Sequence, residues 1–241
     1  MLLKMYEEII IKLPQKKLKL IKLIIIGAGG FGSEVLETIN DCNKKKKRFK
    51  VYGFIDENKS LIDKNILGVP ILGNIKYLLS LKVRDYECLI TVADPVLRKK
   101  IVEKLNNKVD FCRVIHPSVI YSSFTKIGKG CIIQPGNILM PNTRLGNHVI
   151  INMHCTVGHN SYLKNFVSMM PGVHIGGNNT INEGVYVGSG TITNEKINVG
   201  KWSVIGSGSV IIKHIPDNSL VIGIPGKIKR KIKSLNDRPQ L

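Results

Sequence analysis

Two histidines, His154 and His159, stand close together in the segment Ile151–Asn165, which reads INMHCTVGHNSYLKN. An imidazole has an ordinary pKa of about 6.5, so near neutral pH it can accept a proton, release one or bind a metal ion. The pair therefore suggests three uses: ligands of a metal site, a general base with a helper, or two surface side chains without a role. Their spacing alone does not decide among these uses, so the surrounding pattern must.

The chain around the histidines repeats every six residues. Neither an α-helix, with about 3.6 residues per turn, nor a strand that alternates every two sustains such a register, whereas a solenoid does. Three hexads predict a triangular coil of about 18 residues, with one aliphatic side chain pointing inward per face. The repeated positions, aliphatic except for Thr193, are Ile127, Ile133, Leu139, Leu145, Ile151, Val157, Leu163, Met169, Ile175, Ile181, Val187, Thr193, Val199, Ile205 and Ile211.

Glycine or asparagine often follows the inward aliphatic residue, as at Gly128, Asn152 and Gly158. Because these residue types tolerate positive φ, we expect them to form the tight corners of the coil. His159 lies two positions after Val157 and therefore near a corner. The small residue Gly177, one coil later, leaves space beside its ring.

The first half of the chain has a different pattern, in which strands alternate with helices. A continuous apolar strand, Leu23–Gly27, leads into the glycine-rich GAGGFG of Gly27–Gly32 and then into a helix. Two more strands follow, KVYGFID ending at Asp56 and ECLITVA ending at Ala93. This alternation predicts a parallel α/β sheet.

The glycine loop fits the pattern G-x-G-x-x-G, with Gly27, Gly29 and Gly32 in the three glycine positions. Such a loop lets the backbone approach a phosphate, which the free N–H groups of the following helix then bind. The segment from Lys22 to Phe111 has room for about four strands, too few for the two mononucleotide-binding halves that NAD requires. The loop thus predicts a single nucleotide diphosphate, with a tight turn that binds nothing as the alternative.

Four further motifs narrow the interpretation: the hexads themselves, IHPSVI at Ile115–Ile120, TVGHN at Thr156–Asn160 and VIGIPGKIKR at Val221–Arg230. Together with the glycine loop, they resemble the hexapeptide-repeat nucleotide-sugar acetyltransferases of bacterial surface-glycan pathways. That family includes N-acetyltransferases of nucleotide-linked 4-amino sugars and relatives of the sialic acid O-acetyltransferases. The resemblance implies an α/β nucleotide-binding domain with a small parallel, Rossmann-like sheet, followed by a left-handed parallel β-helix.

The resemblance also implies an activity, the acetyl-CoA-dependent N-acetylation of a nucleotide-linked amino sugar, with a 4-amino-4,6-dideoxy hexose as the expected substrate. It places the catalytic base at His159, with Asn160 and Asn152 close to the reacting groups. Many relatives carry a carboxylate directly after the histidine. Asn160 lacks that charge, so His159 is expected to be a weaker base here. Three alternatives remain: a sugar O-acetyltransferase, a metal-dependent lyase like the gamma-class carbonic anhydrases, and a β-helix subunit that only binds ligands.

The same resemblance assigns the ligand-binding residues. The sugar nucleotide is expected at Gly29, Gly30, Phe31 and Asp56, with Ala93 and Asp94 as further candidates. Coenzyme A is expected along the outer wall of the β-helix, between two subunits of a homotrimer. The residues predicted to bind it are Ser168, Gly177, Ser189, Gly206 and Ser207.

No metal site is expected. The gamma-class carbonic anhydrases place a His-x4-His pair on the same β-helix, together with a third histidine two coils earlier. His154 and His159 reproduce the pair, but Ser118 stands where the third ligand should be. Zinc needs three or four protein ligands in the correct places, so two histidines are too few.

Composition limits the partners and the compartment. The formal net charge of +19 favours anionic ligands such as the phosphates of coenzyme A and of a sugar nucleotide, although codon bias toward lysine explains it equally well. Five cysteines without a CxxC pair predict free thiols in a reducing compartment, and therefore a cytoplasmic protein. We expect no membrane span, at most a weak peripheral membrane association, and no nucleic-acid partner.

The predicted domain boundaries follow from these patterns. Residues 1–19 form an N-terminal extension, and residues 20–112 the α/β domain. Residues 113–230 form the β-helix, and residues 231–241 a basic tail. His116 and Pro117 are expected to mark the junction between the two domains.

Overall fold

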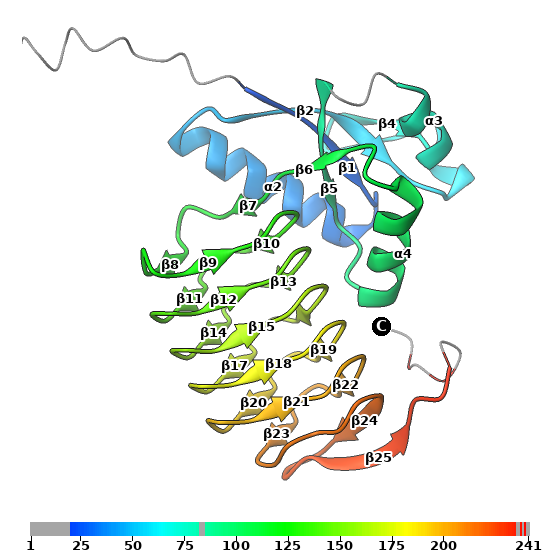
Figure 1. The fold of residues 1–241 in the computed structure, drawn as a ribbon. Coiled ribbons are helices and arrows are strands. Elements are labelled where there is room, and N and C mark those ends of the chain that lie inside the picture. The colour runs from blue at the N-terminus through cyan, green and yellow to red at the C-terminus, as the bar shows by residue number, and fades with distance from the viewer. Residues whose placement is uncertain (1–19, 82–84, 235–236, 238, 240–241) are drawn as a thin grey trace, which may run out of the picture.

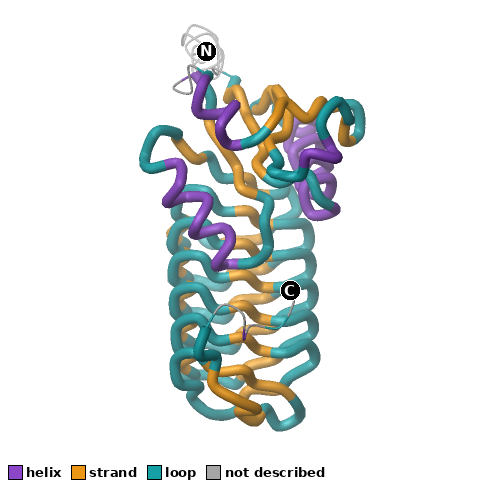
Figure 2. The backbone as a smooth tube through the Cα atoms, turned by 90° about the vertical axis from the view of Figure 1, so that its right-hand side faces the viewer, coloured by secondary structure: helices purple, strands orange, loops and turns teal. Residues whose placement is uncertain are grey.

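The computed structural model describes residues 20–81, 85–234, 237 and 239. An α/β unit lies at one end of a long parallel β-helix, and one of its helices lies along the side of the first coils (Figures 1 and 2). The predicted extension, residues 1–19, lies outside the described residues. In the part of the chain that the structure describes, no helix is long and apolar enough to cross a membrane.

The α/β unit contains a six-stranded sheet in the order β3-β4-β2-β1-β5-β6. All neighbouring strands are parallel except the edge pair β3–β4. The strands are β1 (Ile21–Ile26), β2 (Phe49–Ile55), β3 (Asn65–Ile66), β4 (Val69–Gly73), β5 (Glu87–Ile90) and β6 (Asp110–Phe111). The helices are α2 (Gly30–Lys45), α3 (Ile75–Ser80) and α4 (Pro95–Leu105), with a 3-10 turn η1 (Lys59–Leu61).

From Leu23 to Ile26, strand β1 is apolar and buried because helices cover both faces of the sheet. Leu23 and Ile25 contribute to one hydrophobic cluster together with α2. Ile24 and Ile26 contribute to another together with α3 and α4. The α/β architecture predicted from the alternating pattern is therefore confirmed.

Short strands from residue 114 to residue 222 stack into the three faces of the β-helix. Face 1 consists of β7 (Val114–Ile115), β10 (Ile132–Ile133), β13 (Ile150–Ile151), β16 (Ser168–Met169), β19 (Tyr186–Val187), β22 (Val204–Ile205) and β24 (Ser219–Ile222), extended by the antiparallel β25 (Lys227–Lys231). Face 2 consists of β8 (Ile120–Tyr121), β11 (Ile138–Leu139), β14 (Thr156–Val157), β17 (His174–Ile175), β20 (Ile192–Thr193) and β23 (Val210–Ile211). Face 3 consists of β9 (Lys126–Ile127), β12 (Arg144–Leu145), β15 (Tyr162–Leu163), β18 (Thr180–Ile181) and β21 (Asn198–Val199).

The hexad prediction holds along the whole helix. Strands pair in parallel with residues 18 positions away, as Ile133 does with Ile151 and Leu139 with Val157. The predicted inward side chains form one continuous core. We refer to the turns between the faces as corner 1–2, corner 2–3 and corner 3–1.

One detail of the corner prediction was wrong. The left-handed residue of each corner is the third residue after the inward side chain, as at His148, His154 and Asn160, whose φ values are 56°, 57° and 56°. The glycine directly after the inward residue serves a different purpose: a Cβ at Gly158 would lie 2.5 Å from the carbonyl carbon of Gly176 in the next coil. That position is small because the coils approach closely there.

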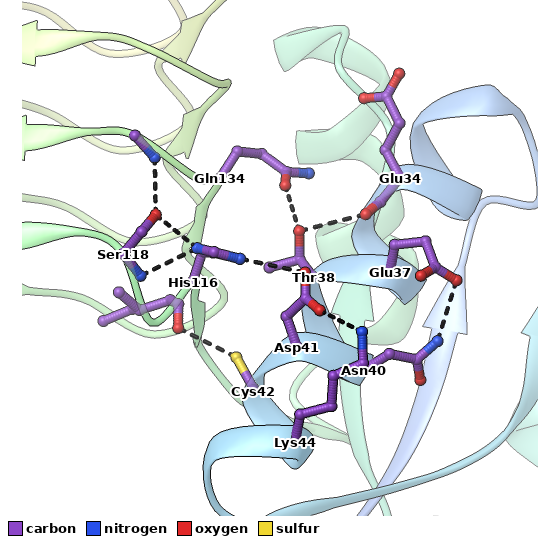
Figure 3. Close-up of polar contacts among 12 residues, drawn as sticks. Glu34, Glu37, Thr38, Asn40, Asp41, Cys42, Lys44, His116, Ser118 and Gln134 are labelled. Atoms are coloured by element: carbon purple, nitrogen blue, oxygen red, sulfur yellow. Dashed lines mark hydrogen bonds and ion pairs between the residues drawn. The ribbon is translucent and has the colours of Figure 1, made fainter.

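The α/β unit packs against face 1. Val35, Leu36 and Ile39 of α2 share a hydrophobic cluster with the outward residues Ile132 and Ile150 of the first coils. Polar contacts surround this cluster (Figure 3).

Around that cluster, Thr38 donates to Gln134, and the Cys42 thiol donates to the Ile115 carbonyl at 3.2 Å. His116 Nε2 lies 3.3 Å from Asp41 Oδ2 (Figure 3). Through this contact, the residue directly after β7 meets α2.

Candidate functional site

His159 projects from corner 2–3 of the β-helix, directly after β14. The backbone around it is held from both sides, because Asn160 N donates to Pro141 O at 3.1 Å and Asn178 N donates to His159 O at 2.8 Å. The His159 side chain is nevertheless exposed to solvent. A turn fixed by backbone hydrogen bonds thus presents an imidazole at the surface.

The two ring nitrogens of His159 have different surroundings. Nδ1 lies 3.0 Å from Asn160 Nδ2, whose amide oxygen accepts from Asn142 Nδ2 at 3.1 Å. The Nε2 edge lies over Gly177, where an added Cβ would be 2.8 Å from Nε2 and 2.9 Å from Cε1. Gly177 therefore provides room for the ring, and a group bound beside it would meet Nε2.

The structure does not bring Asn152 to His159 within one chain. Asn152 lies on corner 1–2, before β14, whereas His159 lies on corner 2–3, after it. The Asn152 side chain is 7% exposed, and its Oδ1 accepts from Met153 N at 2.8 Å. The predicted trio of catalytic residues thus divides into a close pair, His159 and Asn160, and a separate asparagine.

His154 also belongs to corner 1–2. Its ring reaches back over the preceding coil, where a Cβ at Gly136 would be 2.7 Å from Nδ1. In the described part of the chain, no three His, Cys, Asp or Glu side chains are grouped so that they could hold a metal ion. The spacing of His154 and His159 along the sequence therefore does not place them in one site.

The residues predicted to bind coenzyme A also lie on two different corners of the β-helix. Ser189, Gly206 and Ser207 lie together on corner 1–2, whereas Gly177 lies on corner 2–3 beside His159. Gly206 and Ser207 line a hollow of about 350 Å³, together with Tyr186 and Ile222. This hollow has the size of a small-ligand site.

The prediction for Ser168 was wrong. Its side chain is fully buried where face 1 meets the α/β unit. Its hydroxyl donates to Ala93 O at 2.7 Å and accepts from the Arg98 guanidinium at 2.8 Å. The residue therefore joins the two units and is not open to coenzyme A.

The glycine loop has the geometry of a phosphate site. Gly29 is the N-cap of α2 and has no side-chain cap, so the first N–H groups of the helix stay available. The space beside Gly29 and Gly30 is open, whereas a Cβ at Gly32 would clash with Gly27 O. Phe31 is half-buried and packs against the hydrophobic cluster under α2, so only part of its ring faces outward.

A hollow of about 390 Å³ adjoins the loop at the carboxyl ends of the strands. It lies where the chain order of the sheet reverses, between β1 and β5, which is the usual ligand site of parallel α/β sheets. Asp56 lines it and fixes the loop, because its Oδ2 accepts from Ala28 N at 2.8 Å. Lys100 and Lys104 also line it, and Lys104 Nζ lies 3.0 Å from Oε1 of Glu57, which lines it as well.

Ala93 and Asp94 have structural partners at the edge of this hollow. Asp94 is the N-cap of α4, with Oδ1 accepting from Val96 N at 2.7 Å and from Leu97 N at 2.8 Å. Ala93 uses its carbonyl oxygen to accept from Arg98 and Ser168. Their side of the hollow is thus held by contacts with the β-helix.

Arg98 is a residue that sequence reasoning missed. Its guanidinium is fully buried, and burial lowers its pKa to about 9. It donates to neutral acceptors only, among them Val92 O at 2.6 Å, His148 O at 3.0 Å and Phe166 O at 2.8 Å. Within the sequence RKK it resembles a surface arginine, so no local signal could have identified it.

His148, on corner 3–1, is buried at the same junction. Its ring stacks on Phe166 with centroids 5.3 Å apart and meets Phe111 edge-on at 4.6 Å. Among the described residues neither ring nitrogen has a hydrogen-bond partner. Burial, with help from the Arg98 and Lys129 charges, lowers the pKa of His148 to about 4, so it stays neutral at physiological pH.

Known proteins share both units of this chain. Residues 22–105 match the family model of the PglD N-terminal domain, and residues 124–159 match that of the bacterial transferase hexapeptide, six repeats. The acetyltransferase domain of PglB from Neisseria gonorrhoeae FA1090, solved with acetyl coenzyme A, is 30% identical. The alignment covers 87% of this chain and 99% of that one, with a TM-score of 0.79. The chain belongs to the hexapeptide-repeat nucleotide-sugar acetyltransferases.

Two further proteins resemble this chain along most of its length. GDP-perosamine N-acetyltransferase from Escherichia coli O157:H7 is 27% identical over 200 residues, which is 83% of this chain and 81% of the relative. PerB from Caulobacter crescentus, solved with CoA and GDP-perosamine, is 26% identical. The alignment covers 87% of this chain and 97% of the PerB chain, with a TM-score of 0.79. The predicted family and its left-handed β-helical fold are confirmed.

Proposed function

We propose that this chain transfers the acetyl group of acetyl-CoA to the amine of a nucleotide-linked amino sugar. The observation that carries the proposal is the His159 ring, which is exposed at a corner held by backbone hydrogen bonds, with its Nε2 edge over the small residue Gly177. The relatives solved with acetyl coenzyme A, and with CoA and GDP-perosamine, support the two substrates. The uncapped glycine loop and the hollow beside it fit the diphosphate of the sugar nucleotide.

The reaction requires one proton acceptor. The amine nitrogen attacks the thioester carbonyl carbon, the C–N bond forms, and His159 Nε2 takes the proton that leaves the nitrogen. The C–S bond then breaks, and the coenzyme A sulfur leaves and accepts that proton from the imidazolium. For this role Nε2 must carry no hydrogen in the resting enzyme, so the single proton of the neutral ring must sit on Nδ1.

A homotrimer would complete the site. His159 and the hollow at Gly206 and Ser207 lie on different corners of one chain, so a second copy is needed to bring them together. Exposed apolar residues of face 2 support such an association, since Ile120, Ile138 and Ile192 are 65%, 37% and 45% exposed. We place this enzyme in the cytoplasm, in the synthesis of surface glycans, with a 4-amino-4,6-dideoxy hexose as its sugar.

The experiment that tests the function is a matrix of sugar nucleotides against acetyl-CoA. A ligand that binds only the native state raises the melting temperature, so we expect GDP-, UDP- or dTDP-linked 4-amino sugars to stabilise the protein. Mass spectrometry should then detect the acetylated sugar nucleotide with wild-type protein and little of it with His159→Gln. Acetylation of 4-hydroxy but not 4-amino sugars would favour the O-acetyltransferase alternative, and absence of any acetylated product would contradict the proposal.

A further inference from the structure

The side chains of two successive coils form a chain that ends on the ring of His159. Asn142 Nδ2 donates to Asn160 Oδ1 at 3.1 Å, and Asn160 Nδ2 lies 3.0 Å from His159 Nδ1. Asn142 and Asn160 occupy the same left-handed position of corner 2–3, with φ values of 62° and 56°. The stacking of the coils therefore fixes the distance between the two amides.

The direction of the hydrogen bonds from Asn142 through Asn160 decides which nitrogen of His159 carries the proton. When the Asn160 amide nitrogen faces Nδ1, it donates there, and the neutral ring must carry its proton on Nε2. When both amides are turned by half a turn, Asn160 Oδ1 accepts from Nδ1–H and Nε2 becomes the free base. Asn160 can turn in this way without losing a bond only if Asn142 offers its oxygen instead of its nitrogen.

We infer that Asn142 is a positioning residue that selects the tautomer of His159 through Asn160, an inference that rests on the proposed function of His159 as the base. Asparagine can act as donor or acceptor, so the pair Asn142–Asn160 supports both directions. It can therefore hold Nδ1–H while Nε2 accepts the proton from the substrate. In this chain two stacked amides do what a single carboxylate after the histidine would do, since a carboxylate can only accept.

The alternative explanation is a purely conformational role, because asparagine is one of the few residues that tolerate a left-handed corner. Two substitutions at the same position separate the roles. Asn142→Gly keeps the backbone conformation and removes the amide. Asn142→Asp also tolerates the corner and supplies a carboxylate, which forces Asn160 to donate toward residue 142 and to turn its oxygen toward His159.

The experiment measures the tautomer of His159 directly. The chain contains six histidines, so protein labelled with ¹⁵N-histidine is studied by NMR, and the His159 signals are assigned from their absence in His159→Gln. We expect the ratio of Nδ1–H to Nε2–H ring to differ at least about fivefold between Asn142→Asp and Asn142→Gly, with Asn142→Asp richer in Nδ1–H. Asn178 occupies the same corner position one coil after Asn160, with φ 56°. Asn178→Gly is the control, and its tautomer ratio should match that of wild type.

Turnover provides a second readout. If the fraction of free Nε2 limits the base, kcat should be about tenfold lower in Asn142→Gly than in Asn142→Asp, with similar KM for the sugar nucleotide. Equal tautomer ratios in the two variants would overturn the inference, whatever the activity. A failure of the proposed function would look different: the ratios would differ as expected, while His159→Gln would leave acetyl transfer intact.

Discussion

His148 and His159 stand at neighbouring corners of the same β-helix, but their surroundings differ in almost every respect. His148 holds the left-handed corner position itself, and its ring is enclosed by Phe111, Phe166 and the arginine that joins the two units. His159 precedes the left-handed Asn160, and its ring projects into solvent with one nitrogen held by an amide. Burial lowers the pKa of His148 and keeps its ring neutral, whereas the ring of His159 is exposed to solvent.

The comparison teaches that a shift of one residue at a corner changes where a side chain points. Residues at the left-handed position reach back over the preceding coil, as His154 does over Gly136 and Trp202 over Gly184. The residue before it is not bound to one direction: His159 lies over Gly177 of the following coil, whereas Asn147 Oδ1 accepts from Lys129 N of the preceding coil. In the β-helix as the structure describes it, His159 is the histidine that stands at this earlier position, and its imidazole projects into solvent.

The largest expected effect comes from removing the exposed ring. His159→Gln should lower kcat for acetyl transfer by roughly 10²–10⁴, the usual contribution of a positioned general base. The melting temperature should hardly change, because the side chain is exposed. His154→Gln is the control, and its kcat should stay near wild type. Steady-state kinetics with one sugar nucleotide checks both variants, and near wild-type turnover in His159→Gln would contradict the mechanism.

The next largest effect concerns Arg98, which donates to carbonyls of both the α/β unit and the β-helix beside His148. Arg98→Met should destabilise the protein by about 3 kcal/mol, because buried carbonyls such as those of His148 and Phe166 lose their donor. Lys99→Met, on the same helix, is the control. It removes the partly exposed pair with Glu183 at 3.1 Å and the contact of Lys99 Nζ with the Trp202 ring, 4.9 Å from its centroid, and should cost about 1 kcal/mol. Urea unfolding measures the two values, and equal losses would show that Arg98 does not join the units.

His148 should also make stability depend on pH. Its pKa is about 4 in the folded protein and about 6.5 when unfolded, so the unfolded state binds more protons between these values. The stability from its neutral form is complete above about pH 6.5 and declines as the pH falls toward about 4. At about pH 5 the loss is about 2 kcal/mol.

The His148→Asn variant isolates this contribution, since asparagine tolerates the left-handed corner and does not titrate in this range. Urea unfolding at about pH 7.5 and about pH 5 should show a smaller loss of stability in the variant than in wild type. An identical pH dependence in both proteins would mean that His148 does not stay neutral when folded.

The smallest expected effect concerns the space beside His159. Gly177→Ala should displace the ring, because the new Cβ would lie 2.8 Å from Nε2, and we expect kcat to fall about tenfold. The double variant His159→Gln/Gly177→Ala shows whether the loss acts through the ring. In the absence of the imidazole, the Gly177→Ala substitution should lower kcat hardly any further. If Gly177→Ala still lowers kcat about tenfold in the His159→Gln background, Gly177 makes a separate contact, such as the predicted one with coenzyme A.

The architecture could be predicted from the sequence alone, because both of the signals that specify it are local. The hexads from Ile127 to Ile211 specify an inward side chain on every face, and a coil of 18 residues is the only register that buries all of them. The glycine loop specifies a strand, a tight turn and an uncapped helix within a few residues. His159 and Asn160 could be identified together because they are adjacent in the chain.

The neighbours of each of these residues could not be predicted in this way, because they come from distant parts of the chain. Ser168 is buried because Ala93 and Arg98, some 70 positions earlier, pack on that part of face 1. Asn152 is separated from His159 because a strand of face 2 runs between two corners, and Asn142 reaches Asn160 because one coil stacks on the next. Periodicity fixes which side chains point inward, but contacts between coils and between domains depend on stacking and docking, which no local pattern encodes.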